Sequence, residues 1–127
     1  MNAPLFLTLV EVIEIHKSQI NLYGGTRGIR DISLLQSAIA QPQMSFSGEF
    51  LHADIYLMAA AYAFHICNNH PFLDGNKRVG LAASLVFLEM NGITIDDPKQ
   101  KLLTAMLSMA QGKLTKDEFA QTLRELC

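Results

Sequence analysis

A short polar loop holds the residues of this sequence whose types and spacing could do chemistry together. It is the run HPFLDGNKR at positions 70–78, which lies between the two most apolar stretches of the chain. Histidine changes its charge readily near neutral pH and suits a general base that takes a proton from a hydroxyl, and His70 opens the loop. Asp74 follows, and one carboxylate beside a phosphate site is a common way to hold a magnesium ion.

The residues after Asp74 predict an anion-binding helix start. A helix beginning at about Gly75 has backbone N–H groups without helical partners in its first turn, at the positive end of the helix dipole. Lys77 and Arg78 follow in that turn. Two cations are unfavourable at this end of a bare helix, so their placement favours a bound phosphate.

Two apolar segments must position this loop. The segments from about 52 to 68 and from 76 to 91 are apolar on nearly every side, which is typical of helices surrounded by other helices. Pro71 disfavours helical geometry at His70, so we expect the first of these helices to end by about Asn69. The imidazole would then be presented from a loop between two buried central helices.

The rest of the sequence predicts an all-α fold. No run of alternating strand residues and no internal repeat is present. Besides the two central helices, capping and stop residues predict four more: about Thr8 to Tyr23 with a capping box at Thr8 and Glu11, Asp31 to Pro42, Asp97 to Ala110, and Thr115 onward. The stretch 42–50 is expected to be an irregular surface loop. We therefore expect one compact domain over residues 1–127, a bundle of about six helices.

Composition excludes several classes of protein. The net charge of -2 leaves no basic surface of the kind that nucleic-acid proteins carry. The two cysteines, Cys67 and Cys127, have no CxxC spacing, so a disulfide framework is not expected. No apolar stretch is long enough to span a membrane, and the N-terminal residues 1–4 lack the basic region of a signal peptide. A cytoplasmic protein is the expectation.

The loop also resembles a known family. The run at 70–78 is similar to the Fic signature, in the NKR variant typical of the Doc toxins of the Fic/Doc family, and the stretches 28–43 and 54–92 also look Doc-like. The resemblance implies a Fic fold in which His70 deprotonates a target hydroxyl and Asp74 holds Mg²⁺. It implies an ATP phosphate site built from Gly75, Asn76, Lys77 and Arg78.

The resemblance further implies an activity and its partners. Doc toxins transfer the γ-phosphate of ATP to elongation factor Tu, and they pair with a Phd-like antitoxin whose C-terminal segment folds onto the toxin. Lys77 and Leu81 replace a glycine and an arginine of the adenylylating Fic enzymes, which favours phosphate transfer. Asn68 and Ala82 stand where Doc has an arginine and an asparagine, so AMP transfer stays open as an alternative.

Other interpretations of the chemistry remain. A helical module could keep the anion loop only to bind phosphates or a partner protein, without turnover. The sequence lacks GxxxxGK[ST], which excludes a conventional P-loop kinase. His16, His52 and His65 show no metal-binding spacing, and we expect ordinary core or surface roles for them.

Overall fold

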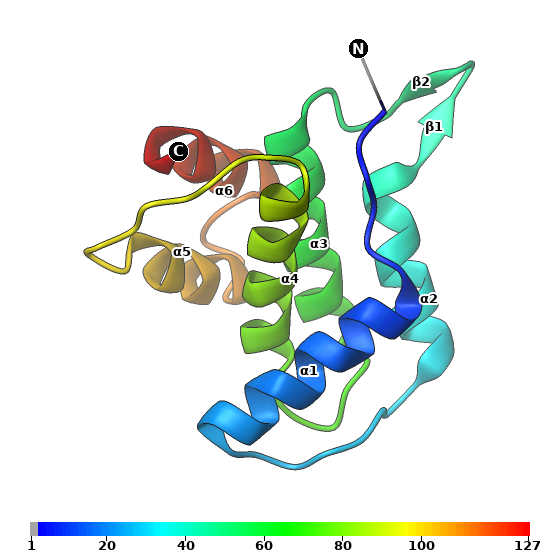
Figure 1. Cartoon of the computed structure of the whole chain (residues 1–127), viewed down its shortest axis with the longest axis vertical. Coiled ribbons are helices and arrows are strands. Elements are labelled where there is room, and N and C mark those ends of the chain that lie inside the picture. The colour runs from blue at the N-terminus through cyan, green and yellow to red at the C-terminus, as the bar shows by residue number, and fades with distance from the viewer. Residues whose placement is uncertain (1–2) are drawn as a thin grey trace.

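Six α-helices separated by short connections account for most of the chain in the computed structural model, which describes residues 3–127 (Figure 1). Met1 and Asn2, part of the segment considered above for a signal peptide, lie outside the described residues. The elements in chain order are α1 (Leu9–Tyr23), α2 (Ile32–Ala40), the 3-10 turn η1 (Gln41–Gln43), β1 (Ser45–Phe46), β2 (Glu49–Phe50), α3 (Ile55–Asn69), α4 (Asn76–Met90), α5 (Lys101–Ala110) and α6 (Lys116–Leu126). The all-α prediction is confirmed, because the described part of the chain has only one two-stranded sheet.

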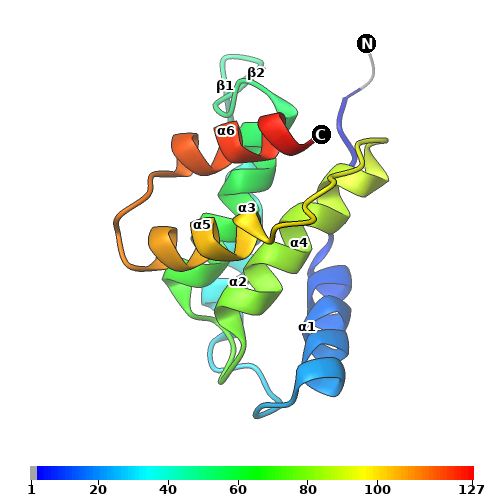
Figure 2. The same cartoon turned by 90° about the vertical axis from the view of Figure 1, so that its left-hand side faces the viewer.

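The helices α3 and α4 form the centre of the bundle, as their apolar sequences predicted. In Figures 1 and 2 they run side by side, with α1 and α2 on one side and α5 and α6 on the other. Both α2 and α6 pack on α3, while α1 packs on α4 and α5 contacts α4 and α6. Within residues 3–127, no helix combines the length and the apolar character that crossing a membrane would require.

Small residues let the two central helices approach closely. Residues Ala59, Ala60 and Ala63 of α3 have no exposed surface. Opposite them, Gly80 of α4 lies so near that a Cβ atom added there would be 2.9 Å from the carbonyl oxygen of Ala63. Real Cβ atoms do not approach a backbone oxygen so closely, so the contact between α3 and α4 depends on glycine at this position.

Polar side chains tie the N-terminal segment to these central helices. The backbone N–H of Leu7 donates to the hydroxyl of Tyr62 on α3 at 2.9 Å. The Asn91 amide, just after α4, accepts from the Leu5 N–H at 2.9 Å and donates to the Leu5 carbonyl at 3.0 Å. The segment before α1 is therefore held along the bundle without secondary structure of its own.

Three predicted helix starts are confirmed. Thr8 caps α1 in a complete capping box with Glu11, and Thr115 caps α6 in the same way with Glu118. The Asp31 carboxylate accepts the Leu34 N–H at 3.1 Å and so caps α2. In each case the side-chain oxygen satisfies an N–H group that the first helical turn leaves without a partner.

Helix α3 begins at Ile55, later than the predicted start near His52. Asp54 is its N-cap, and one carboxylate oxygen accepts the N–H groups of Tyr56 and Leu57, both at 2.9 Å. The predicted start rested on the apolar pattern, which extends upstream of Asp54. The helix instead begins after the aspartate, because its carboxylate can accept the N–H groups of the first turn.

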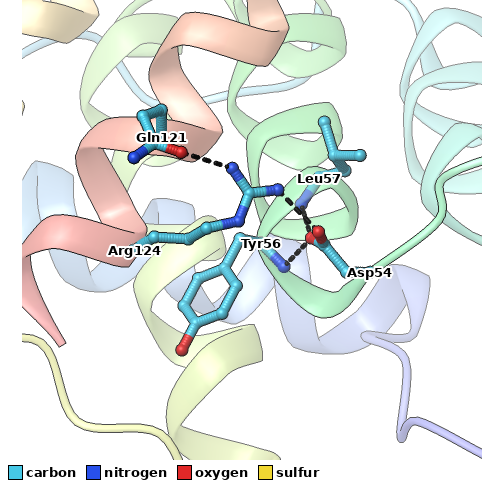
Figure 3. A network of polar contacts seen from close by, with 5 residues as sticks. All are labelled: Asp54, Tyr56, Leu57, Gln121 and Arg124. Carbon is cyan, nitrogen blue, oxygen red and sulfur yellow. Dashed lines mark hydrogen bonds and ion pairs between the residues drawn. The ribbon is translucent and has the colours of Figure 1, made fainter.

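The same aspartate joins α3 to α6. The second oxygen of Asp54 accepts from the Arg124 guanidinium of α6 at 2.6 Å, and the same guanidinium donates to Gln121 at 2.9 Å. Figure 3 shows how these side chains lie between the two helices. The guanidinium also lies 5.6 Å from the centre of the Tyr56 ring. One side chain thus caps α3 and anchors the last helix against it.

The predicted start of α5 at Asp97 is wrong. The helix begins at Lys101, because Gln100 has a left-handed backbone (φ 54°, ψ 39°) that interrupts a helical path from Asp97. The Asp97 carboxylate nevertheless accepts the N–H groups of Lys101 at 2.8 Å and Leu102 at 2.9 Å. Asp97, one turn before the helix, therefore still provides acceptors for the N–H groups of its first turn.

The stretch 42–50, predicted as an irregular loop, is partly regular. After η1 it forms a short hairpin in which Ser45 pairs with Phe50. Its turn contains Ser47 and Gly48, both with positive φ (53° and 82°), as tight hairpin turns require. In both views the hairpin lies at the end of the bundle opposite the α3–α4 loop (Figures 1 and 2).

Candidate functional site

The loop between α3 and α4 presents His70 as the sequence predicted. Helix α3 ends at Asn69, and His70 is its C-cap, with a left-handed backbone (φ 54°, ψ 51°) and an N–H that still bonds to Ile66 at 3.2 Å. The following Pro71 is incompatible with a helical residue before it. His70 is therefore turned out of the helix and exposed.

The α1–α2 loop braces this polar loop along its backbone. The Pro71 carbonyl accepts the N–H groups of Arg30 at 2.7 Å and Asp31 at 3.0 Å, and the Leu73 N–H donates to the Gly28 carbonyl at 3.1 Å. Figures 1 and 2 place the two loops at the same end of the bundle. These bonds fix the course of the chain between His70 and α4.

The side chain of Arg30 clamps the end of α3. Its Nε donates to the His70 carbonyl at 2.7 Å, and its Nη2 donates to the Asn69 carbonyl at 3.0 Å. A cation at this position also complements the negative end of the α3 dipole. Arg30 is thus a supporting residue that the sequence analysis missed, since it lies 40 residues before the histidine that it holds.

Asn76 closes the loop onto the first turn of α4. Its amide oxygen accepts the Phe72 N–H at 3.0 Å, and its amide nitrogen donates to the Phe72 carbonyl at 3.0 Å. Both residues are buried. Both polar atoms of the Asn76 side chain are therefore engaged within the loop. Only the backbone N–H of Asn76 remains to donate to a phosphate.

His16 on α1 supports the same loop from the other side. Its ring is buried, with 4% exposed, and stacks on Phe72 at 3.9 Å between ring centres and an interplanar angle of 5°. Its Nε2 lies 2.9 Å from the Asp74 carbonyl oxygen, which can only accept, so Nε2 carries the hydrogen. The burial agrees with the expected core role, but the hydrogen bond gives His16 a place in the site.

The Asp74 carboxylate is exposed but held in place. One oxygen accepts the Thr26 N–H at 3.0 Å, and the other accepts the Gly75 N–H at 2.8 Å. These hydrogen bonds, that from Thr26 first, keep the pKa of the Asp74 carboxyl below its ordinary value. Gly25 lies against it, and because a Cβ added there would be 2.7 Å from the carboxylate oxygen, any larger residue would force the carboxylate to move.

This carboxylate fits a Mg²⁺ ion. Each oxygen accepts one hydrogen bond and so keeps lone-pair capacity for a metal, and the negatively charged form is favoured. Mg²⁺ commonly binds through one or two carboxylates plus substrate phosphates and water. In residues 3–127 no group of three or more His, Cys, Asp or Glu side chains could hold a metal, so an ion at Asp74 would need phosphate or water ligands.

The two cationic side chains after Gly75 differ in their exposure and in their contacts. Lys77 is exposed. The Arg78 guanidinium donates to the Gly24 carbonyl at 3.0 Å and lies 5.4 Å from the centre of the Tyr23 ring, so it also ties α4 to the end of α1. Both residues are in the first turn of α4, which starts at Asn76 after the Gly75 N-cap.

One cavity of about 410 Å³ collects the residues that the sequence singled out. They are His70, Asp74, Gly75, Asn76, Lys77 and Arg78. Leu81 of α4, which the sequence analysis compared with an arginine of the adenylylating Fic enzymes, also lines it. So do three apolar side chains of α5 that the sequence analysis did not assign to the site: Leu103, Met106 and Leu107. The arrangement brings a possible base, a possible metal ligand and the positive start of a helix to one space.

Comparison with known proteins agrees with this arrangement. The sequence model of the Fic/DOC family matches residues 6–88, from before α1 to near the end of α4. The chain is 32% identical over 117 residues to "Protein kinase doc" of Escherichia phage P1, covering 91% of this chain and 90% of that protein. It is 37% identical over 73 residues to "Toxin Doc" of Mycolicibacterium smegmatis, covering 58% of this chain and 56% of that protein.

Proposed function

This chain belongs to the Fic/Doc family, and on that basis we propose that it is the toxin of a toxin–antitoxin pair and a Mg-ATP-dependent protein kinase. It would move the γ-phosphate of ATP to a serine or threonine hydroxyl of elongation factor Tu and so stop translation. The observation that carries the proposal is that His70, Asp74 and the first turn of α4 line one cavity.

In this proposal His70 is the general base. The hydroxyl oxygen of the target attacks the γ-phosphorus while its proton passes to the imidazole, a P–O bond to the target forms, and the bond from the γ-phosphorus to the bridging oxygen breaks. ADP leaves. The left-handed backbone of His70 and the two hydrogen bonds from Arg30 support this role, because they fix the backbone that carries the ring and turn it out of α3.

The rest of the cavity floor would stabilise the phosphates. Asp74 would hold Mg²⁺, which neutralises phosphate charge when bound. The backbone N–H of Asn76, with the side chains of Lys77 and Arg78, would bind the phosphate oxygens, and Gly75, whose N–H donates to the Asp74 carboxylate, would let a phosphate approach closely. Asn76 has this role through its backbone, since its side chain is bonded to Phe72.

AMP transfer is the second candidate. The family resemblance places Asn68 and Ala82 where Doc has an arginine and an asparagine, so the nucleotide could lie in the opposite direction. Against this, Lys77 and Leu81 both line the cavity, where adenylylating relatives have a glycine and an arginine. We favour the kinase because these two residues lie within the site.

We propose a Phd-like antitoxin as the partner, with its C-terminal segment folded onto this chain, and the cytoplasm as the location. Two relatives named "Protein kinase doc" and "Toxin Doc" support the toxin assignment. A toxin that acts on translation must be held inactive by a partner made in the same cell, which supports both the partner and the location.

A cell-free translation reaction tests the proposal. Wild-type protein with ATP should stop peptide synthesis, and His70→Ala and Asp74→Asn should each permit it. Asp96→Asn, at an exposed acid outside the cavity, is the matched control and should inhibit like the wild type. Full inhibition by a folded His70→Ala protein would contradict the enzyme and favour a helical module that inhibits by binding.

A further inference from the structure

Exposed leucines surround the mouth of the candidate active-site cavity. Leu103 and Leu107 of α5 are 49% and 43% exposed, and Leu73 of the polar loop is 53% exposed. All three line the same cavity. Large apolar side chains that gather around one hollow mark a surface that a ligand covers, because leaving them in water is unfavourable.

The lining is divided into a polar floor and an apolar wall. The loop and the start of α4 supply four ionisable side chains: His70, Asp74, Lys77 and Arg78. From α5, the cavity receives three residues, none of which has a polar side chain: Leu103, Met106 and Leu107. A ligand that fits both parts is anionic at one end and flat and apolar at the other.

The wall has few groups that could hydrogen-bond to a ligand. Met106 and Leu107 lie inside α5, where backbone N–H and C=O groups bond to one another along the helix, and Leu103 lies in the first turn, where its N–H has no helical partner. Leu81 lies inside α4 in the same way. Cys67 is the remaining lining residue near this side, and its thiol is a weak donor that burial keeps neutral by raising its pKa.

We propose that the α5 wall binds the base of the nucleotide through its faces without distinguishing one purine from another, so that the protein uses ATP and GTP to a similar extent. This inference rests on the proposed function, which puts the phosphates on the polar floor. A site that recognises a base by hydrogen bonds rejects the wrong base strongly, because its polar groups are left unpaired. An apolar wall has no polar side chain to leave unpaired.

Direct binding tests the inference independently of catalysis. Calorimetric titration of the purified protein with Mg-ATP, Mg-GTP and magnesium tripolyphosphate gives three dissociation constants. We expect the values for ATP and GTP to agree within about tenfold, and tripolyphosphate to bind more weakly than either. A preference for one purine above about tenfold, or tripolyphosphate binding as tightly as ATP, would overturn the inference.

Variants in the wall show where the base lies. Leu107→Gln and Leu103→Gln should each weaken ATP and GTP binding by about tenfold and leave tripolyphosphate binding unchanged. Val10→Gln, at a position of α1 that is 66% exposed, is the matched control and should change none of the three. Unchanged ATP binding in both leucine variants would contradict the assignment. A protein that binds nucleotides in this pattern but transfers no phosphate would retain the base site and lose the proposed function.

Discussion

The polar loop has its shape because residues from three different elements bond to its backbone. His16 from α1 holds the Asp74 carbonyl, Arg30 from the α1–α2 loop holds the carbonyl of His70, and Asn76 from α4 holds Phe72 at both its N–H and its carbonyl. These supporting residues leave His70 and the Asp74 carboxylate exposed at the cavity. The residues that support the backbone of the loop are therefore different from the two residues that could take part in a reaction.

His16 provides the first test at this scale. His16→Phe keeps an aromatic ring for stacking on Phe72 but removes the donor to the Asp74 carbonyl, which should lower the free energy of unfolding by about 1–2 kcal/mol. Because Asp74 then loses one support, more Mg²⁺ should be needed for half-maximal activity. A magnesium titration of activity measures this, and an unchanged titration curve with a folded variant would show that His16 has only a structural role.

Gly25 provides the second test. A Cβ on Gly25 would collide with the Asp74 carboxylate at 2.7 Å, so Gly25→Ala should reduce activity by more than about tenfold. Gly24→Ala is the control, since Gly24 also has a positive φ (81°) but no atom within 4 Å of an added Cβ. We expect the control to cost about 1–2 kcal/mol of stability and little activity. Equal activity losses in the two variants would contradict the collision.

At this scale the sequence could predict only what is local. The exposed His70 follows from the proline after it, and the start of α4 after Gly75 lies where the sequence predicted it. The contribution of His16 could not be predicted, because it lies 58 residues from the carbonyl that it bonds and its helix gives no sign of a partner. The Asn76 amide, expected at a phosphate, is instead bonded to the neighbouring backbone.

At the scale of elements, the close contact of α3 with α4 sets the distance between the two ends of the loop. Buried alanines on α3 and Gly80 on α4 make that contact, so the loop is short because the helices are near. Local rules predicted most helix starts, as at Thr8, Asp31 and Thr115. They failed at α5, where the left-handed Gln100 has no signal in the sequence.

Gly80→Ala tests the helix contact. Alanine favours a helix over glycine by about 1 kcal/mol, but here its methyl group would lie 2.9 Å from the Ala63 carbonyl oxygen and 3.3 Å from Met106. We expect the steric clash to outweigh the gain in helix propensity, so the free energy of unfolding should fall by about 1–3 kcal/mol, measured by urea denaturation. Thr104→Ala, at an exposed position of α5, controls for helix propensity and should be neutral or stabilising. A stabilised Gly80→Ala protein would refute the close contact.

At the scale of the whole molecule, a cluster of titratable side chains links the last helix to the centre. The Lys116 ammonium lies 3.0 Å from Nε2 of His52 and 3.3 Å from Nε2 of His65. Burial, and then the charge of Lys116, lower the pKa of His65 to about 4 and also lower the pKa of His52. Both imidazoles are therefore neutral in the folded protein at neutral pH, and each can accept from Lys116.

This cluster predicts how stability depends on pH. The unfolded chain takes up protons on His52 and His65 below their ordinary pKa of 6.5, whereas folded His65 does so only near pH 4. The free energy of unfolding should therefore fall as the pH drops from about 6.5 to about 4. Urea denaturation across this range measures it, and His65→Asn should flatten the slope. A slope that the variant leaves unchanged would assign the acid sensitivity to other groups, such as the carboxylates with lowered pKa.

The overall architecture was the part of the molecule that the sequence predicted best. Apolar residues on every side of two long segments indicated central helices, and the bundle is built around them. The hairpin at 45–50 was missed because each strand has only two residues, too few for an alternating pattern. The apolar wall of the cavity was missed because α5 and the polar loop meet only in the folded chain.

The most direct test of the central claim is the fate of the phosphates of ATP. Purified protein would be incubated with elongation factor Tu and Mg²⁺, and with ATP labelled at either the α- or the γ-phosphate, with His70→Ala as the control. The proposed kinase predicts that elongation factor Tu gains label from the γ-position alone and that the control gains none. Label from the α-position would contradict the kinase in favour of AMP transfer, and no label from either position would contradict catalysis on this target.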